Sequence, residues 1–136
     1  MEDHKLPALL AAVTGQKTVA FGDGLLELND TTIGFEICEE LWAPRSSHID
    51  QSLAGAEIVV NGSGSHTEIR KASYAIELIK SASAKCGIAY VFSNLRGCDG
   101  ERVYLNGCST IVVNGNILKL GEQYSLINVV SCAVNA

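Results

Sequence analysis

Charged residues are scarce in this chain, and no segment of it is strongly basic. Asp, Glu, Lys and Arg make up 18% of the 136 residues, and the formal net charge is −5. Non-specific binding to nucleic acid needs a basic patch, so that class of function is disfavoured. Apolar residues make up 47% of the chain, which argues against disorder and is enough for one domain with its own core.

Long hydrophobic runs are also missing. The longest apolar runs are interrupted by Gly, Asn or Ser well before the roughly 18 residues that a membrane-spanning helix needs. The first five residues, Met-Glu-Asp-His-Lys, are not the basic lead-in of a secretory signal peptide. We therefore expect a cytoplasmic protein with no membrane partner.

The cysteines do not form a recognisable framework. There are five, at positions 38, 86, 98, 108 and 132, with no CxxC pair and no histidine at metal-ligand spacing. An odd number of scattered cysteines suggests neither a disulfide scaffold nor a zinc site. Reduced thiols in the cytosol are the simplest account, and no metal ligand is predicted.

The segments that are present alternate in a way that predicts an α/β fold. Apolar residues recur every three to four positions over the longest expected helix, which runs from Thr67 to Cys86 and is ended by Gly87. Shorter helices are expected over 6–13 and 46–53. Strands are expected over 18–21, 25–28, 31–37, 57–61 and 88–93, then 108–113, 116–120 and 129–134.

One stretch organises the rest of the chain. The apolar strand over 31–37 ends abruptly at Cys38, which two acids, Glu39 and Glu40, follow. A sharp turn at the carboxyl end of a buried strand can hold a nucleophile at the rim of a sheet. Cys38 could equally be a small buried hydrophobic residue. On this stretch alone both interpretations remain open.

Other strand ends favour the catalytic interpretation of Cys38. In an open α/β sheet, ligands bind just beyond the carboxyl ends of the strands. The loops 61–66 and 93–99 follow two of the expected strands and supply Asn, Ser and Gly for orienting a polar substrate. We interpret His66 as a hydrogen-bonding residue of its loop rather than a base, and we place His48 on a helix surface.

The motifs, taken in order, show a specific resemblance. They are Phe21-Gly22, Gly34 to Trp42 with its Cys-Glu-Glu-Leu-Trp core, Asn61-Gly62-Ser63-Gly64-Ser65-His66, Arg70-Lys71, Gly97 to Arg102, Tyr104, Gly107-Cys108 and Gly121 to Leu126. Together they resemble the nitrilase-type glutaminase domain of glutamine-dependent NAD synthetases. The resemblance extends from about Leu6 to Val134 and is therefore far more specific than a lone Glu-x-Cys pattern.

The resemblance implies a fold and a set of roles. The fold is a nitrilase-like αββα sandwich, here truncated at its N-terminal side, so that 1–136 form a partial carbon–nitrogen hydrolase domain without the synthetase domain. The family's nucleophile falls on Cys38, its pocket-lining acid on Glu39 and its substrate-binding serine on Ser65. Its basic partner for the substrate carboxylate falls on Lys71, with Arg70 as the adjacent candidate.

The family's chemistry is hydrolysis of the glutamine side-chain amide, which supplies ammonia to a synthetase domain of the same polypeptide. That step needs no cofactor, whereas ATP and Mg²⁺ belong to the synthetase domain. The family also implies assembly into a homo-oligomer. Alternatives are a carbon–nitrogen hydrolase acting on another amide and a non-catalytic interaction module.

The resemblance also implies two helper groups, which we expect upstream of the first residue of this chain. They are a glutamate general base and a lysine beside the oxyanion, and nothing in positions 1–30 replaces them. The negative charges of Glu39 and Glu40 also disfavour the thiolate form of Cys38. General acid–base help contributes roughly 10²–10⁴-fold to such a rate, so we expect the isolated chain to have little glutaminase activity.

Overall fold

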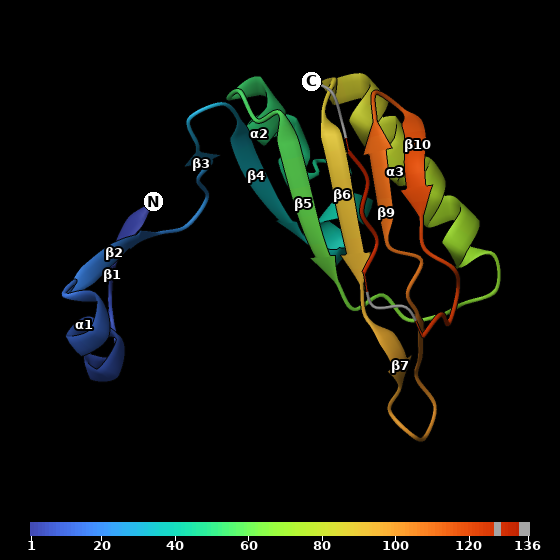
Figure 1. Ribbon diagram of the computed structural model, residues 1–136, viewed down its shortest axis with the longest axis horizontal. Helices are drawn as coiled ribbons and strands as arrows, with labels where there is room; N and C mark the ends of the chain where they lie inside the picture. Colours follow the sequence, from blue (N-terminus) through green and yellow to red (C-terminus); the bar gives the residue numbers. More distant parts are fainter. Residues whose placement is uncertain (127–128, 134–136) are drawn as a thin grey trace.

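A six-stranded mixed sheet forms the centre of the computed structural model, which describes residues 1–126 and 129–133 (Figure 1). Three parallel strands lie in its middle, and antiparallel strands lie at both edges. Across the sheet the strands are β10 (Asn116–Leu120), β9 (Thr110–Val113), β6 (Ala89–Asn94), β5 (Ile58–Ser63), β4 (Thr32–Ile37) and β3 (Leu26–Glu27).

The parallel strands β4, β5 and β6 confirm the predicted α/β class. Their apolar, β-branched sequences suit a sheet buried between neighbours. Ile37 of β4 pairs with Gly62 of β5, and Ser63 of β5 pairs with Asn94 of β6. The carboxyl ends of all three strands therefore meet at one edge of the sheet, as expected from the loops that follow them.

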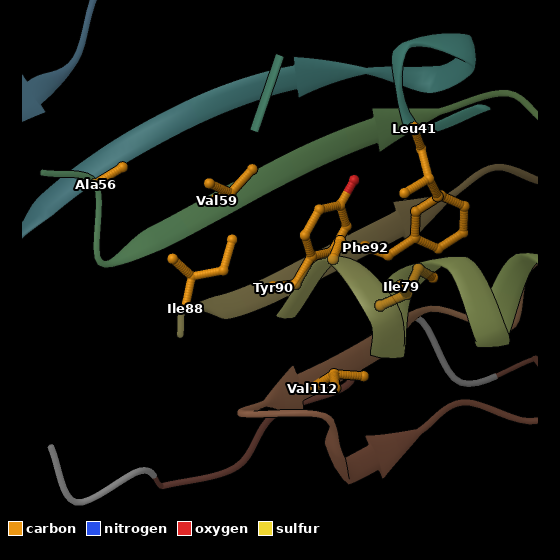
Figure 2. Packing of buried hydrophobic residues seen from close by; sticks show 9 residues of the cluster. Leu41, Ala56, Val59, Ile79, Ile88, Tyr90, Phe92 and Val112 are labelled. Carbon is orange, nitrogen blue, oxygen red and sulfur yellow. The ribbon is translucent and has the colours of Figure 1, made fainter. Parts of the chain in front are cut away.

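Helices α2 (Ser47–Leu53) and α3 (Lys71–Cys86) pack against this sheet. The core between the layers contains Val59, Tyr90 and Phe92 from the strands and Ile79 from α3 (Figure 2). Gly34 of β4 lies so close to the Gln51 side chain of α2 that a Cβ there would collide with it. Glycine at this position is thus what lets α2 approach the strand that ends at Cys38.

Helix α3 begins later than its sequence pattern predicts. The pattern starts at Thr67, but the helix starts at Lys71, after Arg70 with a left-handed φ of 68°. The Thr67 N–H donates to the Tyr104 carbonyl at 2.7 Å, which ties the preceding loop to a neighbouring hairpin instead. At the other end the predicted stop is confirmed, because Gly87 is the left-handed C-cap.

The N-terminal segment forms a separate unit beside the sheet (Figure 1). Strands β1 (Glu2–Lys5) and β2 (Thr18–Phe21) pair in antiparallel fashion, and helix α1 (Ala8–Thr14) lies in the connection between them. The helix and β2 were expected, but the all-polar β1 was not. None of the residues of α1 is buried, and Leu9 and Val13 are largely exposed.

The C-terminal part contains two hairpins. Strands β7 (Arg96–Cys98) and β8 (Tyr104–Asn106) form one, which extends beyond the carboxyl end of β6 (Figure 1). Strands β9 and β10 confirm the predicted hairpin around Asn114-Gly115. The strand expected over 129–134 is wrong for 129–133, which have no regular secondary structure; 134 lies outside the described residues. In the part of the chain described here, no helix is long and apolar enough to cross a bilayer.

Candidate active site

Cys38 lies where β4 ends and a short 3₁₀ helix, η1 (Cys38–Trp42), begins. Its φ is 42°, in the left-handed region that side chains with a Cβ rarely adopt. Such a conformation costs about 1–3 kcal/mol and persists only where the surroundings enforce it. The turn that the sequence predicts at the end of this strand is therefore present, and it is strained at the cysteine itself.

Two hydrogen bonds hold the backbone of this turn. The Ile37 N–H donates to Glu40 Oε2 at 2.6 Å, which closes the turn locally. The Cys38 N–H donates to Asn61 Oδ1 at 3.0 Å, which attaches the turn to the neighbouring strand β5. The Glu40 carboxylate thus binds the backbone of the turn, while Glu39 is the acid that lines the pocket described below.

The thiol of Cys38 has a polar neighbour at the end of β5. The Ser63 hydroxyl donates to Cys38 Sγ at 3.5 Å, and Cys38 is half-buried. This contact joins the sulfur to the carboxyl end of the neighbouring strand β5.

An open pocket of about 610 Å³ lies next to Cys38. All five residues assigned from the resemblance line it: Cys38, Glu39, Ser65, Arg70 and Lys71. They come from η1, from the loop after β5 and from the start of α3. The fold thus brings together residues that are up to 33 positions apart in the sequence (71 − 38).

Lys71 is the cation best placed in this pocket. Its side chain is 20% exposed, its Nζ lies 5.6 Å from the centre of the Trp42 ring, and it contacts Glu68 Oε1 at 3.2 Å. Glu68 also contacts His66 Nε2 at 2.6 Å. The hydrogen bond and charge of Lys71, helped by His66, lower the pKa of Glu68. His66 therefore orders its own loop, as the sequence suggested.

The loop that carries Ser65 is fixed by the end of β6. The Asn94 side chain accepts from the Ser65 N–H at 2.9 Å and donates to the Ser65 carbonyl at 3.2 Å. The same amide donates to Asn106 Oδ1 at 3.2 Å. Asn94 pairs with the backbone of Ser65 much as a neighbouring strand would, and it thereby sets where Ser65 meets the pocket.

Beneath Cys38 lies a buried polar cluster on the helix-facing side of the sheet. Glu36 is 2% exposed and accepts from the backbone N–H of His48 at 3.1 Å; His48 Nδ1 lies 2.9 Å away. Tyr90 donates its hydroxyl to the same carboxylate. The prediction that His48 lies on a helix surface is wrong: it is 6% exposed and faces the sheet.

The cluster shifts the pKa values of Glu36 and Tyr90 in opposite directions. Burial raises the pKa of Glu36, but the hydrogen bonds from His48 and Tyr90 outweigh it, and the pKa lies below its ordinary value. Burial and the nearby Glu36 carboxylate raise the pKa of Tyr90. Both shifts favour an ionised Glu36 and a protonated Tyr90.

Comparison with known proteins places this geometry in a family. The family model described as carbon–nitrogen hydrolase matches residues 6–134. The chain belongs to the carbon–nitrogen hydrolase family. The predicted resemblance is confirmed in the same way: the chain is 56% identical over 128 residues to the glutamine-dependent NAD(+) synthetase of Drosophila melanogaster and 50% identical to that of Mus musculus.

These matches cover most of this chain but little of the relatives. They include 94% of the chain, which spans only 16% and 18% of the length of the two relatives. A crystal structure of a glutamine-dependent NAD(+) synthetase from Cytophaga hutchinsonii superposes with a TM-score of 0.73 at 27% identity. That match covers 93% of this chain and 19% of the other. The nitrilase-type fold is thus confirmed for the carbon–nitrogen hydrolase segment.

Two residues of the buried cluster beneath Cys38 were not singled out from the sequence. Glu36 and Tyr90 are polar residues within apolar strands, and a one-dimensional pattern does not show that both meet His48, which was placed on a helix surface. The signal that was available is the two-residue period of β4, which places Glu36 on the same face as Gly34. Among residues 1–126 and 129–133, no three His, Cys, Asp or Glu side chains are grouped as metal ligands.

Proposed function

We propose that this chain carries the glutamine-hydrolysing site of a glutamine-dependent NAD synthetase, with Cys38 as the nucleophile. The observation that carries the proposal is the placement of Cys38 at a strained turn on the rim of a pocket that Ser65 and Lys71 also line. A carbon–nitrogen hydrolase fold supports cleavage of a C–N bond, and a cysteine at such a turn supports covalent catalysis.

The chemistry follows from the thiolate. Cys38 Sγ attacks the carboxamide carbon of glutamine and forms a C–S bond, and the tetrahedral intermediate then expels ammonia as the C–N bond breaks. Water attacks the resulting thioester, releases glutamate and returns the thiol. The proton transfers need an acid–base group, and the family resemblance assigns it to a glutamate outside these motifs, with a lysine at the oxyanion. That assignment stays a prediction, as does slow turnover by the 136 residues alone.

Free glutamine carries a negative α-carboxylate and a positive α-ammonium, and a binding site needs an opposite charge for each. The ammonium of Lys71 suits the α-carboxylate, and Arg70 is a second cation at the same rim. Glu39 suits the α-ammonium, and the Ser65 hydroxyl can bond the carboxylate. Lys71 now pairs with Glu68, whose side chain is 56% exposed. A substrate carboxylate can replace an exposed partner of this kind at little cost.

The wider role extends beyond this segment. The relatives are named glutamine-dependent NAD(+) synthetase. We propose that the ammonia serves ATP-dependent formation of NAD from deamido-NAD by a synthetase domain of the same polypeptide, in the cytoplasm and within a homo-oligomer. ATP and Mg²⁺ would act only there, and the amide hydrolysis needs no cofactor.

Covalent labelling tests the nucleophile. An electrophilic glutamine analogue, such as a chloroketone of the same length, should label Cys38 in the polypeptide that includes the synthetase domain, and excess glutamine should prevent labelling. Peptide mapping by mass spectrometry separates Cys38 from the exposed Cys98, and Cys98→Ala is the matched control. Cys38→Ala should abolish both labelling and ammonia release.

The outcomes separate the alternatives. Labelling at another cysteine would contradict the proposal. Labelling at Cys38 with turnover of a different amide would favour another carbon–nitrogen hydrolase. The absence of both labelling and ammonia release would favour a non-catalytic module.

A further inference from the structure

The buried cluster beneath Cys38 continues into the hydrogen bond that holds the Cys38 backbone. We propose that Glu36, Tyr90 and Asn61 form a directional hydrogen-bond relay that positions Cys38, and that the negative charge of Glu36 sets its direction. These three are positioning residues, because none of them lines the pocket. Their effect on catalysis rests on the proposed function, but their effect on the Cys38 backbone does not.

The direction starts at the carboxylate. An ionised carboxylate only accepts hydrogen bonds, and Glu36 receives them from His48 and from the Tyr90 hydroxyl. A tyrosine hydroxyl has one proton, so the proton given to Glu36 is not available elsewhere. The Tyr90 oxygen can then only accept from its other neighbour, which is Asn61 Nδ2 at 3.0 Å.

The direction is passed on by the asymmetry of the amide. Asn61 has a donor end and an acceptor end, and the two flipped orientations have nearly the same shape. With Nδ2 committed to Tyr90, Oδ1 must face the other way, where the Cys38 N–H donates to it at 3.0 Å. A flipped amide would instead bring two donors together at Cys38. The charge on Glu36 is therefore what selects the orientation that holds the nucleophile.

Burial makes the selection strict. Glu36, Asn61 and Tyr90 are 2%, 1% and 0% exposed, so water cannot replace a lost partner. An unsatisfied polar group in such surroundings is costly, which links the state of one member to the others. The charged and titratable groups around the relay are His48 on α2 and Glu40 on η1, in addition to Glu36 itself.

The first test reverses the direction of the hydrogen bonds in the relay while keeping the size and shape of the side chain at position 36. In Glu36→Gln, the side-chain amide donates to Tyr90, whose proton then turns toward Asn61 and displaces the acceptor from Cys38. The Cys38 amide should exchange its hydrogen about tenfold faster, the size expected for losing one hydrogen bond. Residue-resolved hydrogen exchange by NMR on the full chain measures this, with the amide of Val59 as the reference for global stability.

A matched control removes a charge elsewhere. Glu77→Gln makes the same chemical change on the exposed face of α3, where Glu77 pairs with Lys80. Exchange at Cys38 should equal that of the unmodified chain. Equal acceleration in both variants, or acceleration in Glu36→Gln that the Val59 reference shares in full, would overturn the relay in favour of general destabilisation.

The second test is a rescue. Asn61→Asp alone leaves two carboxylates competing for the single proton of Tyr90, and it should impair the turn. In the double variant Glu36→Gln/Asn61→Asp, the reversed Tyr90 hydroxyl donates to the new carboxylate, which still accepts from the Cys38 N–H. Slow Cys38 exchange should return in the double variant. If the two changes add instead, the directional relay is wrong, because packing alone gives no reason for a rescue.

Kinetics then connects the relay to the reaction. In the polypeptide that includes the synthetase domain, Glu36→Gln should lower kcat for ammonia release about tenfold or more with KM nearly unchanged, since the relay touches the nucleophile and not the pocket. A rise in KM alone would contradict this. If the unmodified protein releases no ammonia while the exchange rescue holds, the proposed function fails and the relay stands.

Discussion

Two polar regions meet at Cys38, and they differ in their exposure to water. Beneath it, Glu36, Asn61 and Tyr90 are buried, and each polar atom of the relay has a named partner. Above it, Glu68 and His66 have side chains that are 56% and 55% exposed around an open pocket. The buried region fixes where the sulfur lies, and the exposed region is free to exchange its partners for a substrate.

The difference has an energetic consequence. Breaking one partner of a buried pair leaves the other uncompensated, whereas an exposed partner is replaced by water. Changes beneath Cys38 should therefore affect stability and geometry together. Changes above it should affect binding and leave the fold intact.

The largest expected effect is on stability, from Glu36→Ala. This removes the acceptor of His48 and Tyr90 and should lower the free energy of unfolding by about 3–5 kcal/mol. Urea unfolding followed by circular dichroism measures it. Glu68→Ala is the control on the exposed side and should leave the urea midpoint unchanged. Similar losses for the two variants would remove the distinction between the regions.

A smaller effect is expected on binding, from Lys71→Ala. Losing the cation that we propose binds the α-carboxylate should raise KM for glutamine about tenfold or more, the cost of one hydrogen bond to a charged group, with kcat nearly unchanged. Steady-state ammonia release measures both constants, and Lys80→Ala is a matched control outside the pocket. A fall in kcat with unchanged KM would place Lys71 in the chemistry instead.

Acid should weaken the buried region through Glu36. Because folding lowers the pKa of Glu36 below 4.5, its contribution to stability is complete above pH 4.5 and is lost as the pH falls through the folded value. The stability gap between the unmodified chain and Glu36→Gln should therefore shrink in that range. Unfolding measured from neutral pH to well below 4.5 tests this. A gap that stays constant would mean that Glu36 is not ionised.

The smallest effect is expected from an exposed ion pair remote from the pocket. Arg45 Nη2 lies 3.0 Å from Asp50 Oδ2, with side chains 82% and 51% exposed. Arg45→Ala should change the free energy of unfolding by at most about 1 kcal/mol. Differential scanning calorimetry sets this baseline, and a loss as large as that of Glu36→Ala would contradict it.

The sequence predicted the central strands well because their patterns are local. Strands β4, β5 and β6 lie within about two residues of the expected spans, and the stop of α3 at Gly87 follows from its left-handed cap. The predicted start of α3 was wrong because Arg70 has a left-handed φ of 68°, which interrupts a right-handed helix, so the helix begins only at Lys71. Strand β1 was missed because its four residues are all polar.

The site was only partly accessible from the sequence. Motif order was enough to nominate Cys38, Ser65 and Lys71 for one pocket, but the buried relay was not foreseen. In β4 the apolar Phe35 and Ile37 are 48% and 68% exposed, whereas the face with Glu36 is buried beneath α2. Expecting the apolar face of a strand to be the covered one therefore fails here. Which face the helices cover is a property of the whole fold.

The left-handed backbone at Cys38 has a consequence for how this protein can change. A residue without a Cβ adopts a φ of 42° freely, so glycine would fit the backbone at position 38 better than cysteine does. Selection or design for thermostability alone would thus tend to remove the sulfur. For the nucleophile proposed above, the cysteine at this position exchanges some stability of the fold for reactivity.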